Sequence, residues 1–286
     1  MYTRFARHRI TDPASLPFSP VGYSRFKYGD GRIAQQYGQE LGSAFLEAHG
    51  GLLSQYENVV LVPSPYDSIP TASFAMTLAF QERVNMFLYR SGRKSLLQSK
   101  IHRYRTYAED YGAMNLEQRL ALISSDAYHL DRAFLNDRLV LFVDDIRITG
   151  SHEMVIRRQL EREGLIGHFI FLYYAVLDNE SIAPDFENYL NYYDVDCMEK
   201  VIGIFNHRDF VMNTRIVKYI LRGTEETVSG FLERASVPRT NELVNYAISN
   251  SYHLMDEYRT ALNLIIQLTD HGDQSPKRTT RSAQRT

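Results

Sequence analysis

The sequence predicts an α/β protein, in which a parallel sheet is covered by helices on both faces, followed by an all-helical C-terminal part. Two strongly apolar stretches, at residues 140–143 and 168–176, indicate buried strands of the kind found in parallel sheets. Helical patterns alternate with strand patterns up to about residue 205, which favours a sheet covered on both faces. From about residue 209 onward the patterns are helical only.

The composition is that of an ordinary globular protein. Of the 286 residues, 44% are hydrophobic and 23% are charged. The formal net charge of −2 provides no general attraction to nucleic acid, so we do not expect a nucleic-acid partner. Cys197 is the single cysteine, which excludes an internal disulfide and fits a reducing cytoplasm. Residues 1–13 lack the apolar core of a signal peptide, and the longest apolar run, residues 169–177, is too short to span a bilayer. We therefore expect a cytoplasmic protein with no membrane partner.

The elements before the central strand follow from short-range patterns. Residues 1–30 contain three prolines and show no period, which predicts an irregular N-terminal lead. Apolar residues then recur every four positions over residues 31–48, as on one face of a helix. A β-branched strand at residues 59–62 follows, then a turn-rich loop at 63–70 and a second helix over 71–88. Lys27 and Asp30 precede the first helix. They either reach the edge of the sheet at which a ligand would bind or simply cap that helix.

The C-terminal helices are predicted by N-cap residues and by apolar residues at helical spacing. Thr224 precedes Glu225 and Glu226, which is typical of a helix N-cap with acids in the first turn. We divide the chain into an irregular lead (1–30), an α/β domain (31–205), a helical extension (206–270) and a basic tail (271–286) that we expect to be disordered. The extension packs on the sheet domain; a dimerisation element, and hence a homodimer, is the alternative.

The most informative stretch is RLVLFVDDIRITGSH, from Arg138 to His152. A buried strand ends in Asp144 and Asp145, and the small residues that follow lead into a helix that Ser151 or a neighbour caps. The carboxyl ends of such strands form the edge at which α/β sheets bind ligands. A helix start of this kind binds phosphate, and paired carboxylates accept hydrogen bonds from sugar hydroxyls or hold a divalent cation. Together these features predict a ribose 5-phosphate site.

The segment VLFVDDIRITGSH resembles the signature of the type I phosphoribosyltransferases. Over residues 20–200 the chain is most similar to the ComF-like branch, which includes members associated with bacterial stress and tellurite-resistance clusters. The resemblance implies the type I phosphoribosyltransferase fold, with transfer of the phosphoribosyl group from phosphoribosyl pyrophosphate (PRPP) to a nitrogen acceptor and release of pyrophosphate. It also implies a Mg²⁺ cofactor, held by Asp144 and Asp145 directly or through water. By position, these two acids contact the ribose hydroxyls. The implied 5′-phosphate ligands are Thr149, Gly150, Ser151 and His152.

Two further segments acquire roles from this resemblance. The loop at residues 63–70 corresponds to the pyrophosphate loop of the family, where the candidate ligands are Ser64, Tyr66, Asp67 and Ser68, and where Asp67 also has the chemistry to help hold magnesium. The plain alternative is a proline-rich connection. The basic stretch at residues 100–119 resembles the flexible catalytic loop of ComF-like members. Within it, Arg103 and Arg105 would neutralise charge on the pyrophosphate as it leaves; the alternative is an ordinary solvated surface.

Two departures from the family pattern leave the acceptor open. Ile148 stands where purine-salvage members have an acid that assists protonation of the base, and His152 stands where Thr is usual. The alternative function is a protein that senses PRPP or a nucleotide without turnover, in which the motif binds but the lid and the acceptor pocket do not assemble. A strand followed by two aspartates is also found in receiver domains, but there the pair lies near the start of the domain. Here about half of the chain precedes it.

Overall fold

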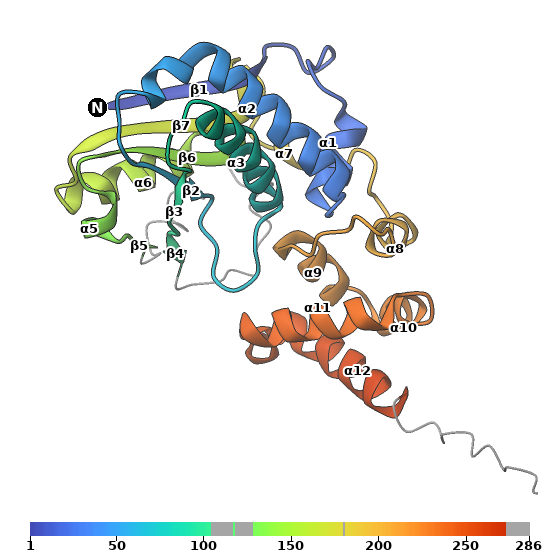
Figure 1. Cartoon of the computed structure of the whole chain (residues 1–286). Helices are drawn as coiled ribbons and strands as arrows, with labels where there is room; N and C mark the ends of the chain where they lie inside the picture. The colour runs from blue at the N-terminus through green and yellow to red at the C-terminus, as the bar shows by residue number, and fades with distance from the viewer. Residues whose placement is uncertain (104–116, 118–127, 180, 273–286) are drawn as a thin grey trace, which may run out of the picture.

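A five-stranded parallel sheet lies at the centre of the N-terminal part of the computed structural model, which describes residues 1–103, 117, 128–179 and 181–272 (Figure 1). The strand order is β1-β7-β6-β2-β3, and every neighbouring pair runs parallel. The strands are β1 (Tyr2–Ile10), β2 (Val59–Pro63), β3 (Leu97–Gln98), β6 (Arg138–Arg147) and β7 (Gly167–Leu177). A separate short pair joins β4 (His102–Arg103) and β5 (Tyr128–His129). The predicted parallel sheet is confirmed.

Helices cover both faces of this sheet. On one face lie α1 (Pro20–Lys27), α2 (Gly31–Leu53) and α3 (Ala72–Arg90), and on the other α5 (Arg132–Leu135) and α6 (Ser151–Arg162) (Figure 1). Successive side chains of a strand point to opposite faces. Thus Leu141 and Val143 of β6 pack into the core under α2 and α3, while Phe142 packs into the core under α6. Both faces of β6 are therefore buried, as its continuous apolar run predicts.

The expectation that residues 1–30 form an irregular lead is wrong. The segment contains β1, which pairs with β7 from Tyr2 opposite Phe169 to Ile10 opposite Leu177, and also α1. Strand β1 lies at the edge of the sheet and is only partly buried, so its sequence mixes apolar and basic residues and lacks an apolar run. Two of the three prolines lie between β1 and α1, and the third, Pro20, is the first residue of α1.

The helical part has its own apolar core. Its elements are α8 (Met198–Phe205), α9 (Thr214–Leu221), α10 (Glu225–Leu232), α11 (Val237–Ser249), the 3₁₀ turn η2 (Tyr252–Leu254) and α12 (Asp256–Gly272). Helix α8 shares this core with α9–α12, and Thr224 caps α10 as predicted by accepting a hydrogen bond from the Thr227 N–H. Helix α7 (Phe186–Asn191) instead packs with Phe186 and Leu190 into the core that the sheet shares with α1–α3. None of the described helices is both long and apolar enough to cross a membrane. The domain boundaries remain predictions, and residues 273–286 of the tail lie outside the described residues.

Helices α2 and α3 pack closely at Gly38, and this contact is testable. A Cβ atom on Gly38 would lie 2.5 Å from Ala79 Cβ and closer still to the Met76 carbonyl oxygen, whereas one on Gly51 of the same helix would meet nothing within 4 Å. We expect Gly38→Ala to destabilise the protein by about 1–3 kcal/mol, because the helices must move apart. Gly51→Ala should be neutral or stabilising by up to about 1 kcal/mol, as expected for glycine replacement in a helix. Urea unfolding of both variants measures the difference, and equal stabilities would contradict the close packing.

Candidate active site

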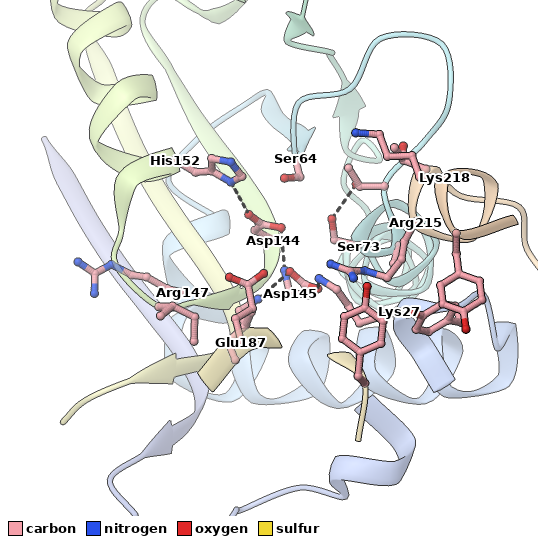
Figure 2. A pocket seen from close by; sticks show the side chains of 18 of the residues that line it. Lys27, Ser64, Ser73, Asp144, Asp145, Arg147, His152, Glu187, Arg215 and Lys218 are labelled. Carbon is pink, nitrogen blue, oxygen red and sulfur yellow. Dashed lines mark hydrogen bonds and ion pairs between the residues drawn. The ribbon is translucent and has the colours of Figure 1, made fainter. Parts of the chain in front are cut away.

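A cavity of about 580 Å³ opens at the carboxyl edge of the sheet, between β6 and α9 (Figure 2). The acid pair and the loop after it line one side of the cavity. Ser64 and the start of α3 line a second side, and residues of α1 and of the helical part line the rest. Segments that are distant in sequence therefore face one space, as expected for a ligand site at this edge.

The two aspartates are part of β6 rather than of the loop after it. The strand continues to pair with β7 at Asp144, Ile146 and Arg147. Because side chains alternate along a strand, Asp144 points toward α6 and Asp145 toward α1. His152 Nδ1 lies 3.6 Å from Asp144 Oδ2. At the end of the sheet both carboxylates still line the same cavity, so the predicted juxtaposition of the acids with the following loop is present.

Asp145 is held by two residues of α1. Lys27 Nζ forms an ion pair with Asp145 Oδ2, and the Tyr23 hydroxyl donates to the same oxygen at 3.2 Å. The Lys27 side chain is 12% exposed and that of Asp145 is 7% exposed. Of the two roles left open for Lys27, the structure supports the one at the functional edge. Asp30, by contrast, caps α2 by accepting hydrogen bonds from the backbone N–H groups of Arg32 and Ile33.

The two carboxyl groups differ in acidity. Burial raises the pKa of Asp144, the nearby charge of Asp145 raises it further, and His152 opposes this rise. Burial also acts to raise the pKa of Asp145, but the charge and hydrogen bond of Lys27, together with hydrogen bonds from the Ile146 N–H and Asp144, outweigh it, and the net pKa of Asp145 is lowered. Asp145 is therefore the firmly ionised member of the pair, and Asp144 is the one that more readily takes a proton.

The loop after β6 has the shape that the sequence predicts for a phosphate site. Gly150 has φ of 75° and is the N-cap of α6, so the cap is the immediate neighbour of Ser151. Thr149 Oγ1 accepts a hydrogen bond from the Ser151 N–H at 3.4 Å. A side chain at Gly150 would adopt an unfavourable left-handed conformation, and its Cβ would lie 2.8 Å from Arg147 Cζ. The first turn of α6 thus begins at the cavity and favours an anion there.

A buried carboxylate lies behind this loop and was not predicted from the sequence. Glu153, in the first turn of α6, is 3% exposed and forms ion pairs with Arg4 at 2.9 Å, Arg147 at 3.2 Å and Arg157 at 2.5 Å. Burial alone would raise the pKa of Glu153, but the arginines, with Arg4 first, lower it. Three guanidinium groups around one carboxylate leave an excess of positive charge beside the predicted phosphate loop.

The predicted pyrophosphate loop is only partly directed toward the cavity. Ser64 lines it. Tyr66 instead packs on Phe74, with Lys100 Nζ 3.9 Å from the centre of its ring, and the Asp67 carbonyl accepts from Lys100. Ser68 contacts the end of α11: its N–H donates to Asn250 Oδ1 at 3.0 Å.

The predicted catalytic arginines fall at the limit of what the structure describes. The backbone of Arg103 belongs to β4 and lies opposite Tyr128, and its side chain lies outside the described residues. Arg105 lies outside them altogether.

The helical part contributes cavity residues that sequence reasoning missed. Arg215 and Lys218 of α9 line the cavity, together with Arg222, the C-cap of that helix. Glu187 of α7 and Tyr192 line it as well. The three cations are spaced three and four residues apart, which places them on one face of a helix. This spacing is visible in the sequence, but it says nothing about which surface the helix faces.

Comparison with known proteins assigns the family. Residues 1–265 match the profile of the ComF-like phosphoribosyltransferases, so the chain belongs to this family and the predicted resemblance is confirmed. It is accordingly a phosphoribosyltransferase, whose class of reaction is phosphoribosyl transfer from PRPP. No curated protein matches the chain.

Several solved structures are similar to the chain at low identity. They include a Bacillus anthracis hypoxanthine-guanine phosphoribosyltransferase (12% identity, 65% of this chain and 95% of that chain, TM-score 0.35). They also include a point mutant of a Trypanosoma cruzi hypoxanthine phosphoribosyltransferase in complex with IMP (13% identity, 53% of this chain and 77% of that chain, TM-score 0.33). A third is the L. donovani hypoxanthine-guanine phosphoribosyltransferase (13%, 50% and 72%, TM-score 0.32). The family assignment rests on the match over residues 1–265.

The Lys27–Asp145 pair gives a prediction about stability and pH. We expect Lys27→Met to destabilise the protein by about 3–5 kcal/mol at pH 7, because Asp145 would be left buried with its charge uncompensated. In the native protein the lowered pKa of Asp145 contributes stability that is present above the ordinary Asp pKa and is lost as pH falls through the folded value. In the variant the pKa of Asp145 should rise. The difference between the two proteins in free energy of unfolding should therefore become smaller as the pH falls toward about 4.

Urea unfolding at both pH values measures this effect. Lys94→Met is the matched control, because Lys94 pairs with Glu57 on the exposed surface and should contribute nothing measurable. A loss of stability that is the same at both pH values would contradict the role of Asp145.

Proposed function

We propose that the protein transfers the phosphoribosyl group of PRPP to a nitrogen acceptor and releases pyrophosphate, and that the cavity between β6 and α9 is where this occurs. The observation that carries the proposal is that the acid pair and the start of α6 line one cavity. A phosphorylated pentose needs this combination of a phosphate site and paired hydroxyl acceptors.

We assign each residue to a part of the substrate from its position in the cavity. Asp144 and Asp145 accept hydrogen bonds from the ribose hydroxyls, and Lys27 and Tyr23 keep Asp145 ionised and oriented for this. Thr149, Gly150, Ser151 and His152 surround the 5′-phosphate at the start of α6. The arginines around Glu153 add positive charge behind that phosphate. Ser64, which lines the same cavity, is assigned to the pyrophosphate.

Magnesium fits this site as an ion bound together with the substrate. Among the described residues no group of three or more His, Cys, Asp or Glu side chains has the geometry to hold a metal ion. Mg²⁺ prefers six oxygen ligands and commonly takes one or two from carboxylates and the rest from phosphates and water. Asp144 and Asp145 supply such carboxylates at the cavity, with Asp144 the better placed because Lys27 already neutralises Asp145. When bound, the ion would neutralise negative charge on the pyrophosphate.

The reaction then requires positioning more than covalent chemistry. The bond between C1 of the ribose and the pyrophosphate oxygen breaks, and its electron pair leaves with the pyrophosphate. The nitrogen of the acceptor forms the new bond to C1 and loses a proton. The two carboxylates hold the sugar in place during this exchange. Ile146, Ile148 and Tyr192 line the same cavity, which suits a flat heterocyclic acceptor better than a small amine.

Pyrophosphate release tests this proposal directly. The protein is incubated with PRPP, Mg²⁺ and a panel of purines, pyrimidines and small amines, and binding of PRPP is measured in parallel by calorimetry. Release with at least one heterocycle supports the transferase. Tight binding of PRPP without release across the panel would instead support a sensor that binds without turnover, and absence of binding would overturn both.

The acid pair provides the corresponding mutational prediction. We expect Asp144→Asn with Asp145→Asn to lower the affinity for PRPP by about 100-fold or more, because two charged hydrogen-bond acceptors for the ribose are lost. Asp144→Asn alone leaves the Lys27–Asp145 pair in place, so a loss of affinity in the single variant is not caused by breaking that buried ion pair. Asp178→Asn, which alters an exposed carboxylate paired with Arg9, is the matched control. Unchanged affinity in the double variant would remove the ribose assignment.

A further inference from the structure

We propose that helix α9 of the helical part binds the pyrophosphate group of PRPP through Arg215 and Lys218. This inference rests on the proposed function, since it assigns the charged wall of the same cavity. It makes the helical part a component of the substrate site rather than an appendage to the sheet domain.

Helix α9 has two different faces. Ile216, Val217, Ile220 and Leu221 are buried in the core of the helical part. Arg215, Lys218 and Arg222 lie on the other face, and all three line the cavity. Figure 2 shows Arg215 and Lys218 across the cavity from Asp144 and His152, on the side of Ser64 and Ser73. The apolar face thus fixes the helix, and the cationic face is presented to the ligand space.

The start of α9 is attached to the end of the predicted pyrophosphate loop. The Thr214 N–H donates to the Pro70 carbonyl at 2.8 Å, and Thr214 Oγ1 donates to the Ile69 carbonyl at 2.9 Å. The Ile69 N–H in turn donates to Asn250 Oδ1 at 3.1 Å, beside the end of α11. Arg215 therefore follows directly on residues that are anchored to the loop in which Ser64 lies. This is the side of the cavity where the pyrophosphate is expected.

The charge of this wall suits a polyanion. The charged residues that α8, α9 and α10 contribute to the described lining are all cations. Arg222 forms an ion pair with Glu257 at 2.5 Å. We assign the ligand contact to Arg215 and Lys218 because these two lie on the side of Ser64 (Figure 2). Arg215 also lies near the acid pair: burial raises the pKa of Tyr23, which donates to Asp145, and the charge of Arg215 opposes that rise.

Charge-assisted hydrogen bonds are the strong ones, and arginine recognises phosphate in a planar, two-point geometry. The start of α6 serves the 5′-phosphate at the opposite side of the cavity. A pair of cations near Ser64 gives the second phosphate-bearing end of PRPP a matching site. The alternative is that the same cations bind an anionic group on the acceptor. If α9 binds the pyrophosphate, its substitution weakens the binding of PRPP; if α9 binds the acceptor, its substitution weakens the binding of the acceptor.

Calorimetric titration with three probes tests the assignment. PRPP, inorganic pyrophosphate and ribose 5-phosphate are titrated, each with Mg²⁺, into the full-length protein and into Arg215→Ala, Lys218→Ala and the double variant. We expect each single variant to bind PRPP and pyrophosphate about tenfold or more weakly. Ribose 5-phosphate, which lacks the pyrophosphate, should bind all of them as it binds the native protein, and this also shows that the variants are folded.

Two controls sharpen the result. Lys200→Ala removes a half-exposed cation of α8 that pairs with Asp196, and should leave all three affinities unchanged. Arg215→Lys keeps the charge but loses the planar geometry, and should retain part of the affinity for PRPP. A uniform loss of affinity for all three probes would mean a structural role and would overturn the assignment.

The outcomes separate this inference from the proposed function. A native protein that binds neither PRPP nor ribose 5-phosphate refutes the proposed function itself. A native protein that binds both, with variants whose affinity for PRPP is unchanged, refutes only the role of α9. In that case a raised KM for the acceptor in the variants would assign the cations to the acceptor instead.

Discussion

The alternation of side chains along β6 is the constraint on which the rest of the site depends. Hydrogen-bond ladders to β2 on one side and β7 on the other hold this strand, and the ladder to β7 extends to Arg147. The two acids are therefore fixed by the sheet and not by a loop. One carboxylate faces α6 and the other faces α1, so each acquires different neighbours and a different acidity although they are adjacent in sequence.

Buried charge is the second feature that shapes the site. Asp145 is compensated by Lys27, and Glu153 by three arginines. Such groups are costly to bury unless every partner is in place. Two of the partners, Lys27 and Arg4, come from the first thirty residues, so the N-terminal segment does more than complete the sheet. It supplies the cations that compensate Asp145 and Glu153, beside the proposed ribose and phosphate positions.

The helical part closes the cavity from the opposite side. Its attachment to the loop after β2, through Thr214 and Asn250, couples the position of α9 to the position of Ser64. The cavity is consequently an interface between the sheet and the helices, and neither part encloses it alone. This arrangement places a cationic surface opposite an acidic one, with room for a ligand that carries both phosphates and hydroxyls.

The sequence by itself determined the parallel sheet, the helical C-terminal part, and the acid pair with the glycine-containing turn that leads into α6, because each is encoded in a few consecutive residues. Strand β1 was not predicted, because an edge strand that is half exposed carries no apolar run. Only the tertiary structure decided that Lys27 reaches Asp145 across 118 positions, that Arg4 reaches Glu153 across 149, and that α9 faces the cavity. Contacts of this kind depend on how whole helices and strands pack, and no local pattern of residues records which of its neighbours in space a charged side chain will meet.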